Sequence, residues 1–122
     1  SLKDFHSRVL LLEFSATNCG PCQAAVPLLK ALREEYSEAD FQLVSFESWG
    51  AKDSAIKFYV QKKDLNYPYI HATDEMLSSY KTGGSAPCFF LLDQNHFVRK
   101  VWFGFSEGTT VRDIREAIKE ML

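Results

Sequence analysis

The cysteine tetrad Cys19-Gly20-Pro21-Cys22 is the part of this sequence best suited to chemistry. It follows a nearly continuous apolar run over residues 8–14 and precedes a segment whose apolar residues recur at helical spacing. The start of a helix offers free backbone N–H groups and a partial positive charge, both of which favour a thiolate over a thiol. Cys22 would lie one turn further along and deeper. We therefore predict that Cys19 attacks a partner's disulfide and that Cys22 resolves the mixed disulfide.

Two less reactive interpretations of the tetrad stay open, a structural zinc site and an inert disulfide. Zinc needs about four ligands. Beyond the third cysteine, Cys88, the candidates are histidines in unrelated predicted segments: His6, His71 and His96. An inert disulfide that closes so short a loop gains little chain-entropy stabilisation. The position of the tetrad, at a strand-to-helix junction within a β-α-β pattern, favours redox chemistry over both. We expect no metal and no cofactor.

The composition limits which other functions the chain can have. Of its 122 residues, 46% are hydrophobic and 25% are charged, as in soluble globular proteins, and the net charge is −2. That charge argues against a nucleic-acid-binding face and against a polybasic membrane patch. Apolar runs such as the one over 9–12 are far too short to span a membrane. The length of 122 residues predicts one domain over residues 1–122. The chain begins without methionine or a signal-peptide pattern, so we expect this domain to be cut from a longer protein.

Hydrophobic periodicity and turn residues predict the elements that must hold the tetrad in place. A strand, a helix and a second strand in succession should form a right-handed unit with two parallel strands, and the last two strands should form a hairpin. We expect an α/β fold whose mixed sheet of four or five strands is flanked by helices. A helical insertion separates its β-α-β and β-β-α halves. The predicted strands are 8–14, 41–46, 67–71, 88–92 and 97–103, and the predicted helices are 20–36, 53–63, 74–81 and 111–121.

Local features refine these predictions. The glycine pair at 83–84 is expected to end the third helix. Thr110 and Asp113 have the spacing of a capping box at the start of the last helix. The aromatic residues of the last two strands, Phe103 included, are expected to lie in the core.

Residues 11–22, Leu-Leu-Glu-Phe-Ser-Ala-Thr-Asn-Cys-Gly-Pro-Cys, resemble the active-site segment of the thioredoxin superfamily. Pro27 matches the proline that bends the active-site helix of that family. The run 85–87, Ser-Ala-Pro before a predicted buried strand, matches its cis-proline loop. The long insertion between Phe46 and Pro87 is similar to that of the TlpA/ResA branch. The resemblance covers nearly the whole chain and implies a thioredoxin fold.

The resemblance also assigns roles to individual residues. Cys19 matches the nucleophile and Cys22 the resolving thiol, while Pro87 matches the cis-proline that packs against the dithiol. Ala86, just before it, would offer its backbone to an extended substrate. Glu13 aligns with the buried acid beneath the dithiol and would accept a proton from Cys22 during resolution, a role that a raised pKa suits. The alternative for Glu13 is a solvated or ion-paired carboxylate at the edge of the site.

The surface around the dithiol departs from the family pattern. Asn18 stands where the family usually has tryptophan, and with Gly20 and Pro21 it would form part of the surface that meets a substrate. Trp49 follows the second predicted strand at the same end of the sheet and is a candidate wall of a partner groove. Cys88 is either a small buried hydrophobic residue or a third thiol near Cys19. The family's lysine partner of the buried acid has no equivalent in the matching stretch, which reads Val-Ser-Phe.

The resulting hypothesis is a thiol-disulfide oxidoreductase that acts on protein disulfides, as a reductase or isomerase rather than an oxidant. The Gly-Pro pair between the cysteines resembles that of reducing thioredoxins. The resemblance implies protein substrates, an upstream electron-donor protein and a bacterial periplasmic location, and we expect a monomer.

Three other functions stay in view. A Cu(I)-handling module would use the thiolates of Cys19, Cys22 and Cys88, since soft ligands suit Cu(I). A peroxidase is disfavoured because Ala16 occupies the position where the peroxiredoxin pattern requires threonine. A docking scaffold with inert thiols is the third.

Overall fold

Strand β1 (Val9–Ser15) runs through the centre of the molecule, and all seven of its residues are buried. Its residues are mostly apolar, so both of its faces must be covered. In the computed structural model, which describes residues 2–122, β1 pairs in parallel with β2 (Phe41–Glu47) and antiparallel with β4 (Cys88–Asp93). The edges of the sheet are β3 (Tyr69–His71) and β5 (Val98–Phe103), in the order β3-β2-β1-β4-β5. The predicted mixed sheet is confirmed, with five strands.

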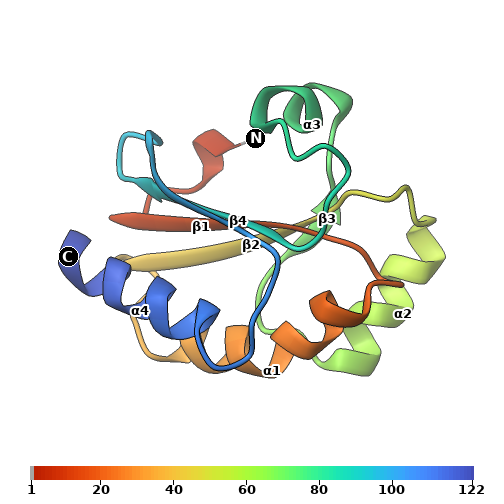
Figure 1. The fold of residues 1–122 in the computed structure, drawn as a ribbon, viewed down its shortest axis with the longest axis horizontal. Helices are drawn as coiled ribbons and strands as arrows, with labels where there is room; N and C mark the ends of the chain where they lie inside the picture. The colour runs from red at the N-terminus through yellow and green to blue at the C-terminus, as the bar shows by residue number, and fades with distance from the viewer. Residues whose placement is uncertain (1) are drawn as a thin grey trace.

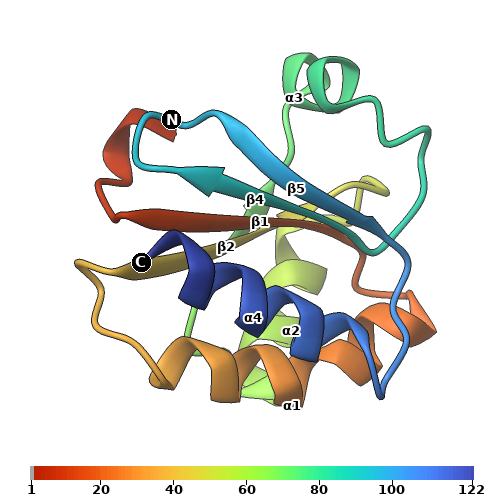
Figure 2. The same ribbon diagram turned by 60° about the vertical axis from the view of Figure 1, so that its left-hand side comes forward.

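The helices cover both faces of this sheet (Figures 1 and 2). On one face lie α1 (Gly20–Glu34), α2 (Asp53–Lys63) and α4 (Thr110–Met121), and on the other lie α3 (Asp74–Tyr80) and the short 3-10 helix η1 (Leu2–Asp4). The sequence did not predict η1. Within residues 2–122, no helix combines the length and the apolar character needed to cross a membrane.

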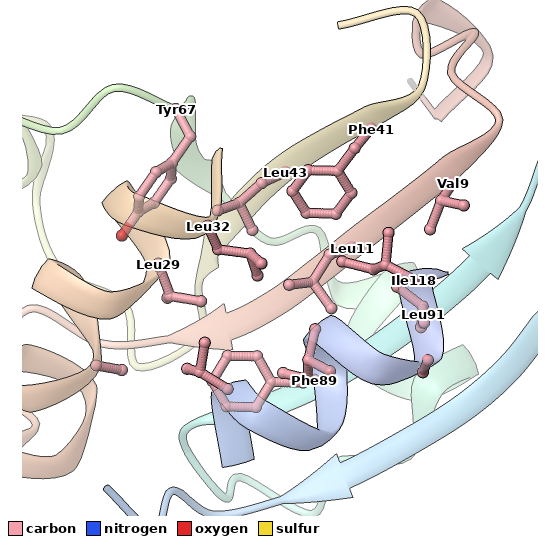
Figure 3. Close-up of a cluster of buried hydrophobic side chains, with 14 residues drawn as sticks. Val9, Leu11, Leu29, Leu32, Phe41, Leu43, Tyr67, Phe89, Leu91 and Ile118 are labelled. Atoms are coloured by element: carbon pink, nitrogen blue, oxygen red, sulfur yellow. The ribbon is translucent and has the colours of Figure 1, made fainter. Parts of the chain in front are cut away.

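Side chains alternate along each strand, so the sheet supplies a hydrophobic cluster to each face. Figure 3 shows the cluster between the sheet and helices α1 and α4, where the labelled strand residues point toward the helices. The helical stripes predicted for α1 and α4 supply the other side of this cluster. Its buried members are Val9, Leu11, Ala25, Leu29, Leu32, Phe41, Leu43, Tyr67, Phe89, Leu91, Val111, Ile114, Ala117 and Ile118.

The opposite face of the sheet carries a second cluster, rich in aromatic rings. Phe14 lies at its centre, with ring centroids 5.6 Å from Phe46 and 5.5 Å from Phe90. Partly buried side chains of α3 and η1 pack over it. The buried members of the cluster are Leu10, Leu12, Phe14, Val44, Phe46, Cys88, Phe90 and Leu92. Successive residues along a strand therefore face α1 and α3 in turn.

Most element boundaries agree with the prediction to within two residues, and the exceptions have local causes. Strand β3 begins at Tyr69 and not at residue 67, because Pro68 has no N–H to donate and pairs only through its carbonyl, which accepts from Ser45 N–H. Helix α3 ends at Tyr80, and its C-cap is Lys81 in the left-handed region at φ 52°. The prediction that the glycine pair would end this helix was wrong by two residues.

The predicted capping box at the start of α4 was also wrong. The helix begins one residue earlier than expected, so its N-cap is Thr109, which makes no side-chain capping bond. Thr110 is already helical, and its Oγ1 accepts a hydrogen bond from the N–H of Ser106 at 2.9 Å. The hydroxyl therefore ties the preceding turn to the helix.

Strand β5 also differs from expectation, because it is the outermost strand and only partly covered. Phe89 and Phe90 on β4 are buried as predicted, whereas Phe103 is 64% exposed. The prediction that Phe103 lies in the core was wrong. An edge strand receives a neighbouring strand on one side alone, so its apolar pattern does not guarantee burial.

Leu11 tests how far the fold depends on the cluster of Figure 3, because it is fully buried at the centre of β1. We expect Leu11→Ala to lower the free energy of unfolding by about 2–5 kcal/mol, since it removes buried methyl groups and leaves a cavity. Urea denaturation would measure the loss. The matched control is Val101→Ala on β5, which is 41% exposed and should cost less than about 1 kcal/mol. Equal losses for both variants would contradict this view of the core.

Candidate active site

The turn between β1 and α1 places Cys19 at the N-cap of the helix. Cys19 has extended backbone angles (φ −113°, ψ 116°), and its Sγ accepts a hydrogen bond from the N–H of Cys22 at 3.3 Å. The Cys19 carbonyl accepts from Gln23 N–H, and Gln23 Nε2 donates back to the Thr17 carbonyl at 2.9 Å. Pro21 lies in the first turn, where its missing N–H leaves no bond unmade. A cysteine sulfur thus occupies the place of the usual capping oxygen.

Cys19 and Cys22 form a disulfide in this structure. Both are buried, with Cys19 3% exposed and Cys22 fully covered, so Cys22 is the deeper of the two, as expected. Asn18, Gly20 and Pro21 beside them are exposed. A partner would therefore meet these three residues first and reach the sulfur of Cys19 between them.

A second loop, ahead of β4, meets the dithiol. The peptide bond between Ala86 and Pro87 is cis, and Pro87 is buried. The carbonyl oxygen of Ala86 lies 3.7 Å from Cys19 Sγ, and Ala86 packs against a small buried cluster of Ala16 and the two cysteines. Within residues 2–122, no group accepts a hydrogen bond from the N–H of Ala86. That donor is free to pair with a ligand's backbone.

Glu13 lies on β1, 2% exposed, on the face that α1 covers, because its position alternates with those of Val9 and Leu11. Burial raises the pKa of its carboxyl to about 7, and the hydrogen bond from Ser45 Oγ, 2.7 Å from Oε1, opposes that rise. No described residue donates to the other oxygen, Oε2. A carboxyl with this pKa can take up or release a proton near neutral pH. The structure does not favour the alternative of a solvated or ion-paired edge carboxylate.

Cys88 lies on the other face of the sheet. It pairs in register with Phe14 and belongs to the aromatic cluster beneath α3. Its Sγ is fully buried and donates to the Ser85 carbonyl at 3.4 Å, and burial raises the pKa of its thiol. Among residues 2–122, no three His, Cys, Asp or Glu side chains gather closely enough to hold a metal ion. The structure therefore separates Cys88 from the pair that the copper hypothesis would join to it.

One further residue lies where β1 and β2 end, and its contacts were not predicted from the sequence. Glu47, the last residue of β2, is 2% exposed, and its carboxyl accepts three hydrogen bonds from three segments. The donors are Thr17 N–H (3.1 Å), Trp49 N–H (2.8 Å) and the hydroxyl of Tyr69 (2.9 Å). An acidic residue that ends a buried strand two positions before Trp49 was the available signal. Nothing in the sequence revealed its partners.

Trp49, a predicted groove residue, is 46% exposed and lies two residues after the end of β2. Its indole Nε1 donates to the carbonyl of Gly84 at 2.8 Å, in the loop that leads to Pro87. The structure therefore brings the tetrad, the cis-proline loop and Trp49 together, and leaves Cys88 on the opposite face.

Several known proteins with similar sequences are named as thiol-disulfide oxidoreductases or as thioredoxin-like. The chain is 31% identical over 124 aligned positions to the thiol-disulfide oxidoreductase ResA of Bacillus thuringiensis subsp. konkukian, a match that covers 99% of this chain and 63% of ResA. It is 26% identical to the thioredoxin-like protein YneN of Bacillus subtilis, across 85% of this chain and 61% of YneN. The chain thus spans a little under two thirds of these relatives.

Solved structures agree with the fold. A thiol-disulfide isomerase from Corynebacterium glutamicum superposes with a TM-score of 0.80 at 18% identity, covering 97% of this chain and 84% of that one. A thiol:disulfide interchange protein of the thioredoxin family from Chlorobium tepidum gives a TM-score of 0.77 at 22% identity, covering 99% and 84%. At these identities the likeness concerns the fold alone, and it confirms the predicted thioredoxin fold.

The sequence pattern of the AhpC/TSA family matches residues 1–101. That range contains the tetrad, Glu13 and the cis-proline loop, and it ends within β5. The match covers most of the chain, and the ResA sequences are similar along nearly all of it. The chain therefore belongs to the AhpC/TSA family, and its relatives include ResA-like members of the thioredoxin superfamily.

Proposed function

We propose that this chain is the redox-active part of a thiol-disulfide oxidoreductase that acts on protein disulfides. The observation that carries the proposal is the hydrogen bond from Cys22 N–H to Cys19 Sγ at the N-cap of α1. In the reduced protein this N–H and the helix dipole stabilise a thiolate at Cys19. The names of the ResA relatives support the same chemistry.

The reaction follows from the order in which the sulfurs can be reached. The Cys19 thiolate attacks one sulfur of a substrate disulfide, which forms a mixed disulfide and expels the other substrate sulfur as a thiolate. Cys22 then loses its proton and attacks Cys19 Sγ, which forms the Cys19–Cys22 disulfide and releases the second substrate thiolate. The substrate gains the two electrons that the dithiol loses, and its two released thiolates take up protons from the solvent.

Glu13 is the proposed acceptor of the Cys22 proton. It is buried on the face that α1 covers, its pKa is about 7, and its Oε2 has no donor among residues 2–122. A base with a pKa near the working pH exchanges protons most effectively. The free lone pairs of Oε2 are the feature that distinguishes this carboxyl from that of Glu47, which receives donors on both oxygens.

The proposed substrate surface consists of the exposed residues around Cys19 and the cis-proline loop. The free N–H of Ala86 would pair with the backbone of an extended segment whose cysteine approaches Cys19. Pro87 holds that loop against the dithiol, and Asn18, Gly20 and Pro21 form the opposite rim. Trp49 supplies an exposed aromatic face at the side.

We further propose that the net direction is reduction or isomerisation, that the protein works as a monomer, and that a separate donor protein returns electrons to the Cys19–Cys22 disulfide. An extracytoplasmic location fits this chemistry, since disulfides persist in oxidising compartments. A structurally similar disulfide oxidoreductase of Mycobacterium tuberculosis is described as secreted, at 15% identity. The Cu(I) alternative lacks a supporting observation, because Cys88 packs in the other cluster.

Trapping of mixed disulfides tests the order of attack. We expect Cys22→Ala to accumulate protein mixed disulfides, because the attacking thiol remains and the resolving thiol is absent. Cys19→Ala should accumulate none. Non-reducing gels and mass spectrometry of acid-quenched reactions with a protein disulfide would measure the adducts. Cys88→Ala is the matched control and should behave like the wild type. Adducts in Cys88→Ala alone would reassign the resolving thiol.

The reduction potential tests the proposed direction. Thioredoxin lies near about −270 mV and the oxidant DsbA near about −120 mV. We expect a value below about −170 mV for the Cys19–Cys22 pair, a range that includes both thioredoxin and protein disulfide isomerase, which lies near about −180 mV. Equilibration with glutathione or dithiothreitol buffers, followed by thiol alkylation, would give the potential. A value close to that of DsbA would reverse the proposed direction.

The raised pKa of Glu13 predicts a pH dependence of stability. In the oxidised protein the folded state holds a proton between the ordinary pKa of 4.5 and about 7, whereas the unfolded state has released it. Stability therefore falls as pH rises through this window, by about 3 kcal/mol in total. Glu13→Gln removes the titration. The stability of wild type minus variant should thus fall by about 3 kcal/mol between about pH 4 and about pH 8, measured by urea denaturation.

The control for this experiment is Ser45→Ala. Loss of the Ser45 hydroxyl removes the bond that lowers the pKa of Glu13, so the window should extend to higher pH. The proposed role adds a kinetic readout, since Glu13→Gln should slow resolution of the mixed disulfide by at least about tenfold. Parallel pH curves for wild type and Glu13→Gln would contradict the raised pKa, and an unchanged resolution rate would contradict the role.

A further inference from the structure

Two loops that are far apart in the sequence form the candidate active site. One joins β1 to α1 and contains Thr17 and Cys19, and the other spans residues 82–87 and ends at the cis-proline. They approach each other directly where the Ala86 carbonyl lies 3.7 Å from Cys19 Sγ. Ala86 also packs against Ala16 and the two cysteines at this point.

A chain of hydrogen bonds joins the same two loops by a second route, through the end of β2. Thr17 N–H donates to Glu47 Oε1 at 3.1 Å, and Trp49 N–H donates to Glu47 Oε2 at 2.8 Å. The Trp49 indole then donates to the carbonyl of Gly84 at 2.8 Å. Each step links a different segment, so Glu47 and Trp49 together connect the loop before Cys19 to the loop before Pro87. We call this set of contacts the Glu47–Trp49 bridge.

Burial of Glu47 requires an explanation, which the bridge provides. A carboxyl group is costly to remove from water unless donors satisfy it. Glu47 is 2% exposed, and backbone N–H groups and the Tyr69 hydroxyl supply those donors. Tyr69 anchors the carboxyl from β3, on the side away from Cys19. The proposed redox steps use neither oxygen, so the contribution of Glu47 is to geometry.

The conformation of Trp49 is equally unusual for a surface residue. Its side chain is 46% exposed, yet its one polar atom is bonded to the Gly84 carbonyl and not left to solvent. Gly84 has a φ of +78°, a backbone conformation that side chains rarely adopt. The bond therefore ties the indole ring to the loop that leads to the cis-proline. An exposed ring held in this way presents a flat apolar face next to the cis-proline loop.

We propose that Glu47 and Trp49 are positioning residues that set the spacing between the dithiol loop and the cis-proline loop, and that the Trp49 ring selects extended polypeptide segments with an apolar side chain near the disulfide. This inference rests on the proposed oxidoreductase function and names its substrate class. A small disulfide needs only the sulfur of Cys19. An extended segment must also fit between Ala86 and the indole, so it alone depends on the bridge.

Two matched substrates separate these requirements. The first is hydroxyethyl disulfide, and the second is a short synthetic peptide whose central cysteine, flanked by leucines, is joined to the same mercaptoethanol group. Trp49→Phe keeps an aromatic ring and removes the indole N–H. We expect it to lower the ratio of kcat/KM for the peptide to kcat/KM for hydroxyethyl disulfide by about fivefold, the effect of one hydrogen bond, mainly through KM.

Two further variants define the specificity of the effect. Glu47→Gln replaces one acceptor oxygen with an NH₂ group and should lower the same ratio at least as much. Phe58→Leu is the aromatic control, because Phe58 is 63% exposed on α2 and belongs to neither loop. It should leave the ratio unchanged. An unchanged ratio in Trp49→Phe, or an equal fall for both substrates, would overturn the inference.

Nuclear magnetic resonance tests the bridge without a substitution at Trp49. The chain has two tryptophans, so two indole N–H signals are expected. The Trp49 signal should exchange with solvent more slowly than in the unfolded chain, and Glu47→Gln should speed its exchange. Exchange as fast as in the unfolded chain would overturn the bridge. If the reduced wild type turns over neither substrate, the proposed function fails, an outcome distinct from an unchanged ratio in an active enzyme.

Discussion

The hydrogen bond from Cys22 N–H to Cys19 Sγ connects the way helix α1 begins with the chemistry proposed for the dithiol. A helix leaves its first N–H groups without partners, and a capping side chain usually satisfies one of them with oxygen. Here the capping atom is sulfur, so the bond that starts α1 also places a backbone donor and the positive end of the helix dipole at Cys19, the residue that we propose as the nucleophile. The buried β1 strand holds this helix start in position, because it cannot shift without moving both hydrophobic clusters.

The alternation of side chains along the strands divides the chemistry between the two faces of the sheet. Glu13 faces α1, where burial raises its pKa toward neutrality. Cys88 faces the aromatic cluster beneath α3, where burial raises the pKa of its thiol and keeps it protonated. Burial thus has opposite consequences for reactivity. It brings the carboxyl into the range in which it exchanges protons, and it makes the third thiol a poorer nucleophile.

The edge of the sheet that carries the site is assembled from segments that meet only in the folded chain. Thr17, Trp49 and Gly84 belong to the connections after β1, β2 and α3. Hydrogen bonds join them in series through Glu47, the last residue of β2. Parallel strands explain this arrangement, since β1 and β2 end at the same edge and release their loops side by side. The antiparallel β4 starts at that edge, which brings the cis-proline loop to the same place.

Periodicity and a strand-to-helix junction are local properties, so the sheet, the helices and the position of the tetrad could be predicted from the residues. The same reasoning placed Glu13 on a buried strand six residues before Cys19. What lies across from each side chain became visible in the folded chain. The three donors to Glu47, the bond from Trp49 to Gly84 and the face occupied by Cys88 depend on register and on contacts between distant segments. Phe103 stays exposed for a related reason, since the strand order alone makes β5 an edge. The local hydrophobic pattern indicates which residues are buried, whereas the pairing of distant segments determines which of these residues contact each other.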